Sequence, residues 1–280
     1  MKIRITAESS CDLSPELVAK YGIKVLPMPV TLGEDVFLDG VDLNPEGIYD
    51  YVSRTKVLPK TNAIAPLQYE EIFTEELKDA DAVIHFSISS GISSCYQNAG
   101  IAAEELENVY VVDTKSLSTG MGLLVLEAAT MAAEENADAA AIAETCRALA
   151  EKLNVSFVLG DLEYMRKGGR CSAVEMFGAN LLKLRPILQM TDGKLGVNNK
   201  LRGPLTKVLE TYIDERLSNA TPRTQRVFFT HTCVDDTIPN LAKKYLEEKG
   251  IFDEILVTRA GATVTSHCGK DTFGILFFNA

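Results

Sequence analysis

The sequence predicts an α/β protein of two domains, an N-terminal three-layer α/β/α domain with a parallel sheet and a C-terminal α/β domain with a mixed sheet. In the first half, short apolar runs alternate with helical segments, as in a parallel sheet covered on both faces. From Val155 onward, paired strands are mixed with helices. A length of 280 residues suits one large or two ordinary domains. We therefore expect domains at residues 1–152 and 153–280.

Two kinds of signal place the elements of the first domain. Serine or asparagine followed by proline, at Ser14-Pro15 and Asn44-Pro45, is a common helix start. Pro27 and Pro29 confine a strand to a sheet edge or interrupt it. The expected elements are a strand at 2–7, a helix from 14, a strand at 24–32, a hairpin or loop at 33–42, a helix from 44, a loop at 60–63, a helix at 66–78, a strand at 82–86, a helix at 93–105, a strand at 109–112 and helices at 119–134 and 138–152.

The second domain is predicted from apolar runs and turn signals. Asp192-Gly193 is typical of a two-residue hairpin turn. The expected elements are a strand at 155–159, a glycine loop at 167–170 that carries a cation, a helix at 173–182, a hairpin of strands 186–190 and 195–197, a helix after Pro204, a strand at 226–230, a helix at 236–247, and strands at 254–258 and 272–278.

The stretch 82–99, AVIHFSISSGISSCYQNA, has the arrangement of a binding site. A buried strand ends in a serine-rich turn, and a helix begins at Ser93-Ser94. Free backbone N–H groups, the positive end of the helix dipole and two hydroxyls would meet at this turn. The turn therefore favours a small anionic group such as a carboxylate or a phosphate. The alternative is that Ser93 only caps its own helix.

Two further loops, at 8–12 and 113–118, also follow strand ends, so all three should share one edge of the sheet. Nucleotide binding is not indicated there. Gly120-Met121-Gly122 lacks the third glycine of a dinucleotide fingerprint, and the chain contains no G-x-x-x-x-G-K-[ST] loop.

Composition excludes several classes of protein. The net charge of −11 argues against nucleic acid or anionic membrane surfaces as partners, because both require a basic face. No apolar run reaches the roughly 18 residues of a membrane span, and the N-terminus lacks a signal-peptide core, so we expect a cytoplasmic protein. The six cysteines form no C-x-x-C pair and are expected to be reduced thiols. His231-Thr232-Cys233 and His267-Cys268 lack zinc spacing, so no metal site is expected.

Eight short motifs run through the chain: Glu8-Ser-Ser-Cys-Asp-Leu13, Lys60-Thr61, Ser89-Ser-Gly-Ile-Ser93, Tyr96-Gln-Asn-Ala99, Val112-Asp-Thr114, Lys167-Gly-Gly-Arg170, Lys200-Leu-Arg-Gly203 and Thr265-Ser-His267. Each motif alone is weak. In this order and spacing they resemble the DegV family, the FakB-type fatty-acid-binding proteins of the bacterial fatty acid kinase system. The resemblance covers essentially the whole chain.

The resemblance implies two domains that clasp a long-chain fatty acid of the palmitate, stearate or oleate type, with its acyl chain in an apolar tunnel of the C-terminal domain. By position in the motifs, Thr61 and Ser93 match the carboxylate ligands at the domain interface. Arg170, Arg202 and His267 match basic residues of the head-group region. The family also implies a separate ATP-binding kinase as partner, to which the acid is presented for conversion to acyl phosphate for phospholipid synthesis. On this reading the chain is not itself an enzyme and has no other cofactor.

Three segments depart from the family pattern. They are Asn62-Ala63-Ile64-Ala65 where the family has Ser-Gln-Pro-Ser, Ser94-Cys95 where it has Gly-Thr, and Lys270-Asp271 where it has Pro-Gly. The hydroxyls of Thr61 and Ser93 are both present. The departures therefore bear on acyl-chain preference and partner docking more than on carboxylate binding.

Other interpretations of these residues stay open. An apolar set offers a tunnel lining but is equally typical of an ordinary core: Phe157, Met165, Met176, Phe177, Leu181, Phe273, Ile275, Leu276, Phe277 and Phe278. Gly91-Ile92-Ser93-Ser94-Cys95 approaches the G-x-S-x-G nucleophile elbow, and Asp113 and His267 could complete a serine hydrolase triad in the order Ser, Asp, His. Each of the three cations could also be an ordinary surface charge.

Overall fold

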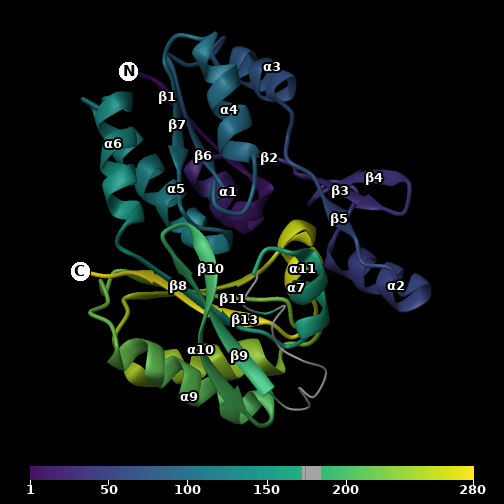
Figure 1. Ribbon diagram of the computed structural model, residues 1–280. Helices are drawn as coiled ribbons and strands as arrows, with labels where there is room; N and C mark the ends of the chain where they lie inside the picture. Colours follow the sequence, from purple (N-terminus) through teal and green to yellow (C-terminus); the bar gives the residue numbers. More distant parts are fainter. Residues whose placement is uncertain (172–173, 175–183) are drawn as a thin grey trace.

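The computed structural model describes residues 1–171, 174 and 184–280. Three β-sheets organise these residues, one wholly parallel, one mixed and one small and antiparallel (Figure 1). The predicted α/β class, with a parallel sheet followed by a mixed sheet, is confirmed. The helix predicted at 173–182 lies, apart from residue 174, outside the described residues, as do Met176, Phe177 and Leu181 of the predicted lining.

The first sheet has four parallel strands in the order β2-β1-β6-β7. They are β1 (Ile3–Glu8), β2 (Lys24–Leu26), β6 (Ala82–Ser87) and β7 (Val109–Asp113). Every residue of β6 is buried, as its continuous apolar pattern predicts. The helices are α1 (Pro15–Tyr21), α3 (Pro66–Glu76), α4 (Cys95–Glu104), α5 (Ser118–Ala132) and α6 (Ala139–Ala150). Helices α3 and α4 cover one face of this sheet and α5 and α6 the other (Figure 1).

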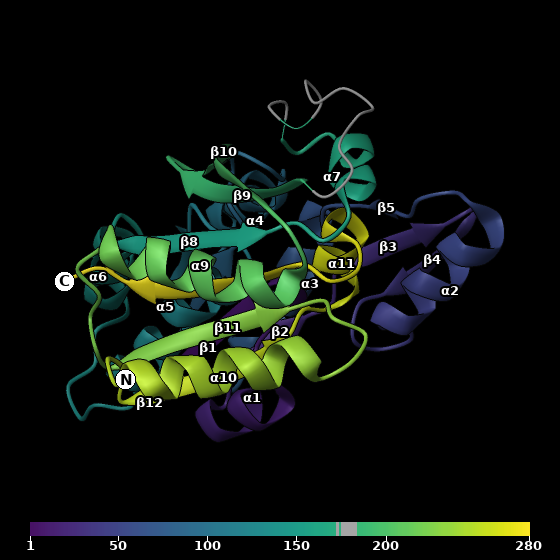
Figure 2. The same ribbon diagram turned by 90° about the horizontal axis from the view of Figure 1, so that it is seen from below.

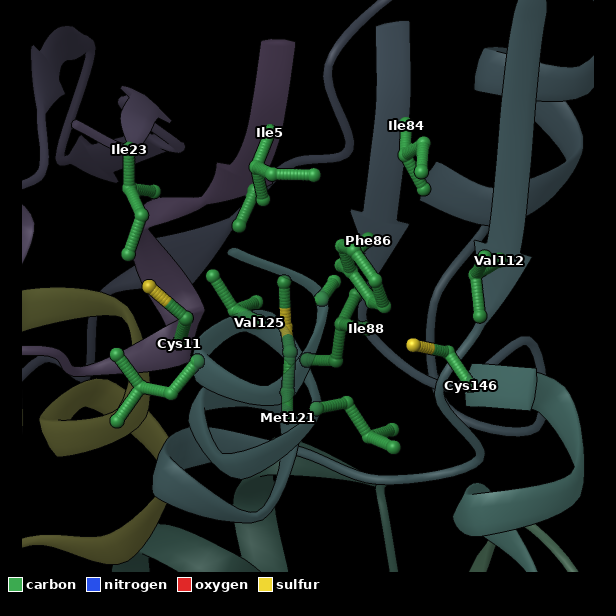
Figure 3. Packing of buried hydrophobic residues seen from close by; sticks show 14 of the residues in the cluster. Ile5, Cys11, Ile23, Ile84, Phe86, Ile88, Val112, Met121, Val125 and Cys146 are labelled. Atoms are coloured by element: carbon green, nitrogen blue, oxygen red, sulfur yellow. The ribbon is translucent and has the colours of Figure 1, made fainter. Parts of the chain in front are cut away.

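Helix α5 lies between the two large sheets. It contacts β1 and β6 of the first sheet, and β8, β11 and β13 of the second. Its Met121 and Val125 point toward Phe86 in the core of the first sheet (Figure 3). On the opposite side, a Cβ atom on Gly120 would lie 2.6 Å from Cγ2 of Val155, so only glycine permits this close approach. The Gly120-Met121-Gly122 segment therefore serves helix packing.

The second sheet has six strands in the order β10-β9-β8-β13-β11-β12, of which only β11 and β12 pair in parallel. They are β8 (Leu153–Val158), β9 (Leu184–Thr191), β10 (Lys194–Arg202), β11 (Arg226–His231), β12 (Glu254–Arg259) and β13 (Phe273–Phe278). The hairpin turn falls at Asp192 and Gly193 as predicted, both with positive φ. Helices α9 (Leu205–Ser218) and α10 (Thr237–Lys249) cover the face that is turned away from α5 (Figures 1 and 2).

The third sheet confirms one prediction and corrects another. It consists of β3 (Pro29–Leu32), β4 (Asp35–Leu38) and β5 (Lys60–Thr61) and lies beside α2 (Pro45–Thr55). The strand expected at 24–32 is interrupted at its prolines, which is one of the two predicted outcomes, because Pro27 and Pro29 have no N–H group for a continuous ladder. Its two halves join different sheets. Lys60 and Thr61, predicted in a loop, pair with β3.

Two helices were not predicted. Lys167 and Gly168 belong to α7 (Leu162–Gly168), which ends at Gly169 with a left-handed backbone, so this segment is not a loop throughout. His267 lies in α11 (Ala262–Cys268). Seven residues hold too little periodicity to predict a helix, and such short helices depend on tertiary contacts. Among the described helices, none has both the length and the apolar character needed to cross a membrane.

Candidate functional site

A cavity lies where loops of the first sheet, β5, α7 and α11 meet. The space between its walls amounts to about 600 Å³, including the part open to solvent. Four of the five predicted site residues line it together: Thr61, Ser93, Arg170 and His267. The remaining lining is mostly apolar: Met28, Asn62, Ala63, Ile88, Ile92, Leu117, Phe157, Met165, Leu195, Thr263, Val264 and Cys268.

Thr61 and His267 form a hydrogen bond across the cavity wall. Thr61 Oγ1 lies 2.8 Å from His267 Nε2. Burial, with a smaller effect of Arg170, lowers the pKa of His267 to about 4, so the ring is neutral at pH 7. Nδ1 of His267 has no hydrogen-bond partner among the described residues. A proton on Nε2 avoids burying an unpaired N–H at Nδ1. His267 then donates to Thr61, and the Thr61 hydroxyl is free to donate to a ligand.

Ser93 lies next to the N-terminal end of α4 and lines the cavity. Its Oγ accepts a hydrogen bond from the backbone N–H of Cys95, the first residue of α4, at 3.2 Å. The N-cap position itself is occupied by Ser94, whose side chain makes no capping bond. Ser93 is half-buried and faces the cavity. A hydroxyl that accepts from its own helix still has a proton to donate, so the two roles are compatible.

The structure separates the two predicted arginines. Arg170 follows the C-terminal end of α7, and its Nη1 donates to the carbonyl of Gly168 at 2.7 Å. It lines both the cavity and an open, polar depression beside Ser93. Arg202 is exposed at the end of β10, and it is not among the described residues that line the cavity. The sequence pattern could not show this separation.

A second cavity adjoins the first on the side of the second sheet. Leu117, Phe157, Val264 and Cys268 line both cavities. The second cavity is also lined by Leu276 and by residues with polar side chains: Ser118, Thr230, His231, Thr232 and Thr272. The two adjoining cavities are called the path below, and Thr61, Ser93, Arg170 and His267 lie in its first part.

Strand geometry decides which of the predicted lining residues face this path. Phe157 and Met165 line the first cavity, and Leu276 lines the second. The other predicted lining residues of β13 belong to the ordinary core instead. Phe273, Ile275 and Phe277 pack beneath α9 and α10, and Phe278 joins the core of the first sheet. Successive side chains of a strand point to opposite faces, so one strand cannot line the path with every residue.

The geometry does not assemble the hydrolase triad. The carboxylate of Asp113 accepts hydrogen bonds from the backbone N–H and hydroxyl of Ser90 and from the N–H of Lys115. Within the described part of the chain, no hydrogen bond joins Asp113 to His267, whose Nε2 is bonded to Thr61. Among the same residues, no cluster of His, Cys, Asp or Glu could hold a metal ion.

Sequence reasoning missed the contribution of α11 and of Met28. Val264 and Cys268 lie one turn apart on α11 and face the same side as Thr263 and His267. Only the motif around His267 could have indicated this helix. Met28 lies in the break between β2 and β3, and no sequence signal marks it as part of the lining.

Fold and cavity together define a two-domain α/β protein with a mainly apolar cavity that also carries hydroxyls, a neutral histidine and an arginine. The chain belongs to the DegV family: residues 2–280 match the model described as "Uncharacterised protein, DegV family COG1307". A DegV domain-containing protein of Caldanaerobacter subterraneus is 30% identical over 99% of this chain and 98% of that relative.

Solved structures of DegV family proteins are similar to this chain over its whole length. A DegV family protein from Thermus thermophilus, described by its fatty acid binding, has a TM-score of 0.91 at 28% identity and covers both chains completely. A fatty acid binding DegV family protein from Streptococcus agalactiae has a TM-score of 0.84 at 25% identity, over 100% of this chain and 99% of that one.

Proposed function

We propose that this protein binds a long-chain fatty acid, with the carboxylate held by Thr61 and Ser93. The observation that carries the proposal is that Thr61, Ser93, Arg170 and His267 lie together in a cavity whose remaining lining is mostly apolar. An amphiphile with a small anionic head and a long apolar tail matches this distribution. The fatty acid binding described for the relatives from T. thermophilus and S. agalactiae supports the same ligand class.

Affinity would come mainly from the tail and orientation from the head. Each buried CH₂ group contributes about 0.8 kcal/mol, so a chain of palmitate length gains far more than the head group does. Hydrogen bonds from hydroxyls to a carboxylate are charge-assisted and short. The neutral His267 donates to Thr61 and thereby directs the Thr61 proton toward the ligand. This arrangement holds an anion without a buried, unpaired cation.

The second part of the proposal is presentation of the bound acid to a separate ATP-dependent kinase, which forms acyl phosphate. Its support is the open depression lined by Ser93, Ser94 and Arg170, which lies directly outside the head-group end of the cavity. A phosphoryl group that approached the carboxylate through this depression would meet a cation. Cations stabilise the charge that develops during phosphoryl transfer.

The purified protein is expected to carry a bound fatty acid. Native mass spectrometry of protein expressed in bacteria should show adducts of acyl mass that disappear on denaturation, because a buried acyl chain leaves slowly. Delipidated protein should take up palmitate or oleate. A bare polypeptide that takes up neither acid would contradict the proposal.

Thr61→Val and Ser93→Ala should each weaken fatty acid binding. Each change removes one donor to a desolvated carboxylate, which is worth about 1.5–3 kcal/mol, or roughly tenfold to a hundredfold in Kd. Titration calorimetry on delipidated protein measures the effect. If Ser93 acted only as a cap, Ser93→Ala would instead lower stability by about 1 kcal/mol and leave the affinity unchanged. Thermal melts of the same variants separate these outcomes.

A further inference from the structure

The segment Glu8–Asp12 lies outside the cavity but contacts both sides of it. It begins at the last residue of β1 and contains a short 3₁₀ turn, Ser9–Cys11. Its two carboxylates are buried and point to different parts of the molecule. None of its residues is among the described residues that line the cavity.

Glu8 holds the loop that carries Ser93. Its side chain is fully buried, and Oε2 accepts from the backbone N–H of Ile88, at the start of that loop, at 2.8 Å. Oε1 accepts from the hydroxyl of Tyr69 at 2.7 Å and lies 3.1 Å from Nε2 of His85. Glu8 thus fixes the start of the loop that carries Ser93, directly through the N–H of Ile88.

Asp12 holds the helix that carries His267. Its Oδ1 accepts from the backbone N–H of Gly261, the N-cap of α11, at 2.7 Å, and its Oδ2 accepts from Ser118 at 2.5 Å. Burial raises the pKa of Asp12 to about 8, while these two hydrogen bonds lower it.

Asp39, which lies between β4 and α2, binds the next two N–H groups at the N-terminal end of α11. It accepts from the N–H groups of Ala262 and Thr263, and from the hydroxyl of Ser9. The first three N–H groups at the start of α11 are therefore all bonded to carboxylates of the N-terminal half.

We propose that Glu8 and Asp12 are positioning residues that set the distance between the two halves of the carboxylate site, Glu8 through Ser93 and Asp12 through His267 and Thr61. The proposal rests on the fatty acid function proposed above. The two halves of the site are Ser93 on one side and Thr61 with His267 on the other. Both carboxylates belong to one five-residue segment, so both halves are attached to the same short piece of backbone. Neither residue touches the ligand, and each acts only through its own half.

Double-mutant cycles test whether Glu8 acts only through Ser93 and Asp12 only through His267. Glu8→Gln is expected to raise the Kd for palmitate about tenfold in the native protein and in the His267→Ala background, but by less than about twofold in the Ser93→Ala background. Asp12→Asn should show the reverse pattern. It should raise the Kd for palmitate by its full factor in the Ser93→Ala background and hardly at all in the His267→Ala background. Equal factors in all backgrounds, or no effect in any, would overturn the proposal. Glu76→Gln, which removes a partly buried carboxylate that pairs with Arg4, is the control for loss of charge.

Amide hydrogen exchange gives a readout that needs no ligand. Glu8→Gln should speed exchange in residues 88–95 only, and Asp12→Asn in residues 261–268 only. If native protein binds no palmitate, the fatty acid function fails, whereas these exchange patterns still decide the positioning roles. Exchange that rises in both segments, or in neither, would show that the carboxylates do not act separately. Should Glu8→Gln fail to fold, Tyr69→Phe removes one donor to Glu8 and replaces it in both experiments.

Discussion

Replacement of Arg202 by alanine is expected to abolish acyl phosphate formation while leaving fatty acid affinity nearly unchanged. Arg202 is exposed and outside the described cavity lining, so its loss should not disturb the bound acid. Arg202 lies outside the described lining of both the cavity and the depression that holds Arg170, so it would serve as a contact for the kinase, and without that contact the bound acid would not be phosphorylated. The measurement is transfer of labelled phosphate from ATP to bound palmitate in the presence of a fatty acid kinase, beside a calorimetric binding curve.

Two further variants complete this experiment. His267→Ala should reduce both turnover and affinity, because His267 hydrogen-bonds Thr61 inside the cavity. Arg54→Ala removes an exposed arginine from α2, distant in the fold from β10, and serves as the control. Normal turnover in the Arg202 and His267 variants would leave lipid carriage as the only supported function.

Gly274→Ala is expected to destabilise the protein by about 3 kcal/mol, the upper end for an overpacked core. A Cβ atom on Gly274 would lie 2.3 Å from the carbonyl oxygen of Ser156 and 2.8 Å from Cβ of Phe157, on the neighbouring strand. Backbone atoms in the middle of a sheet cannot move aside. Chemical denaturation should show a lower midpoint with an unchanged m-value.

Gly100→Ala is the matched control for that substitution. Gly100 lies inside α4, and a Cβ atom there would meet nothing within 4 Å. Alanine is the better helix former, so this variant should gain about 0.5–1 kcal/mol. A neutral or stabilising Gly274→Ala would show that β8 and β13 can separate without cost.

The sequence allowed good prediction of elements whose stability is encoded locally or by a strong pattern. The buried strand predicted at 82–86 and the Asp192-Gly193 turn are examples, since continuous apolarity and turn chemistry are visible in the sequence. Helix α11 was missed because its first turn is held by Asp12 and Asp39, which are more than 200 residues away in the chain.

In the candidate site, too, features encoded in local motifs were predicted and features that depend on tertiary packing were not. Thr61, Ser93, Arg170 and His267 were predicted from family motifs, and the fold brings all four to one cavity. Arg202 was predicted with them because a motif gives order along the chain but not position in space. Met28 and the alternation of roles along β13 depend on how the sheets pack, which no local pattern contains.

The position of α5 between the two large sheets has a consequence for how the protein unfolds. Thr119 on this helix hydrogen-bonds Thr230 of the second sheet, while Met121 is buried in the core of the first. Separation of the halves would expose both sides of a helix that is almost wholly apolar. Melting of either half therefore removes the support of the other, so the chain should unfold in a single cooperative transition despite its two sheets.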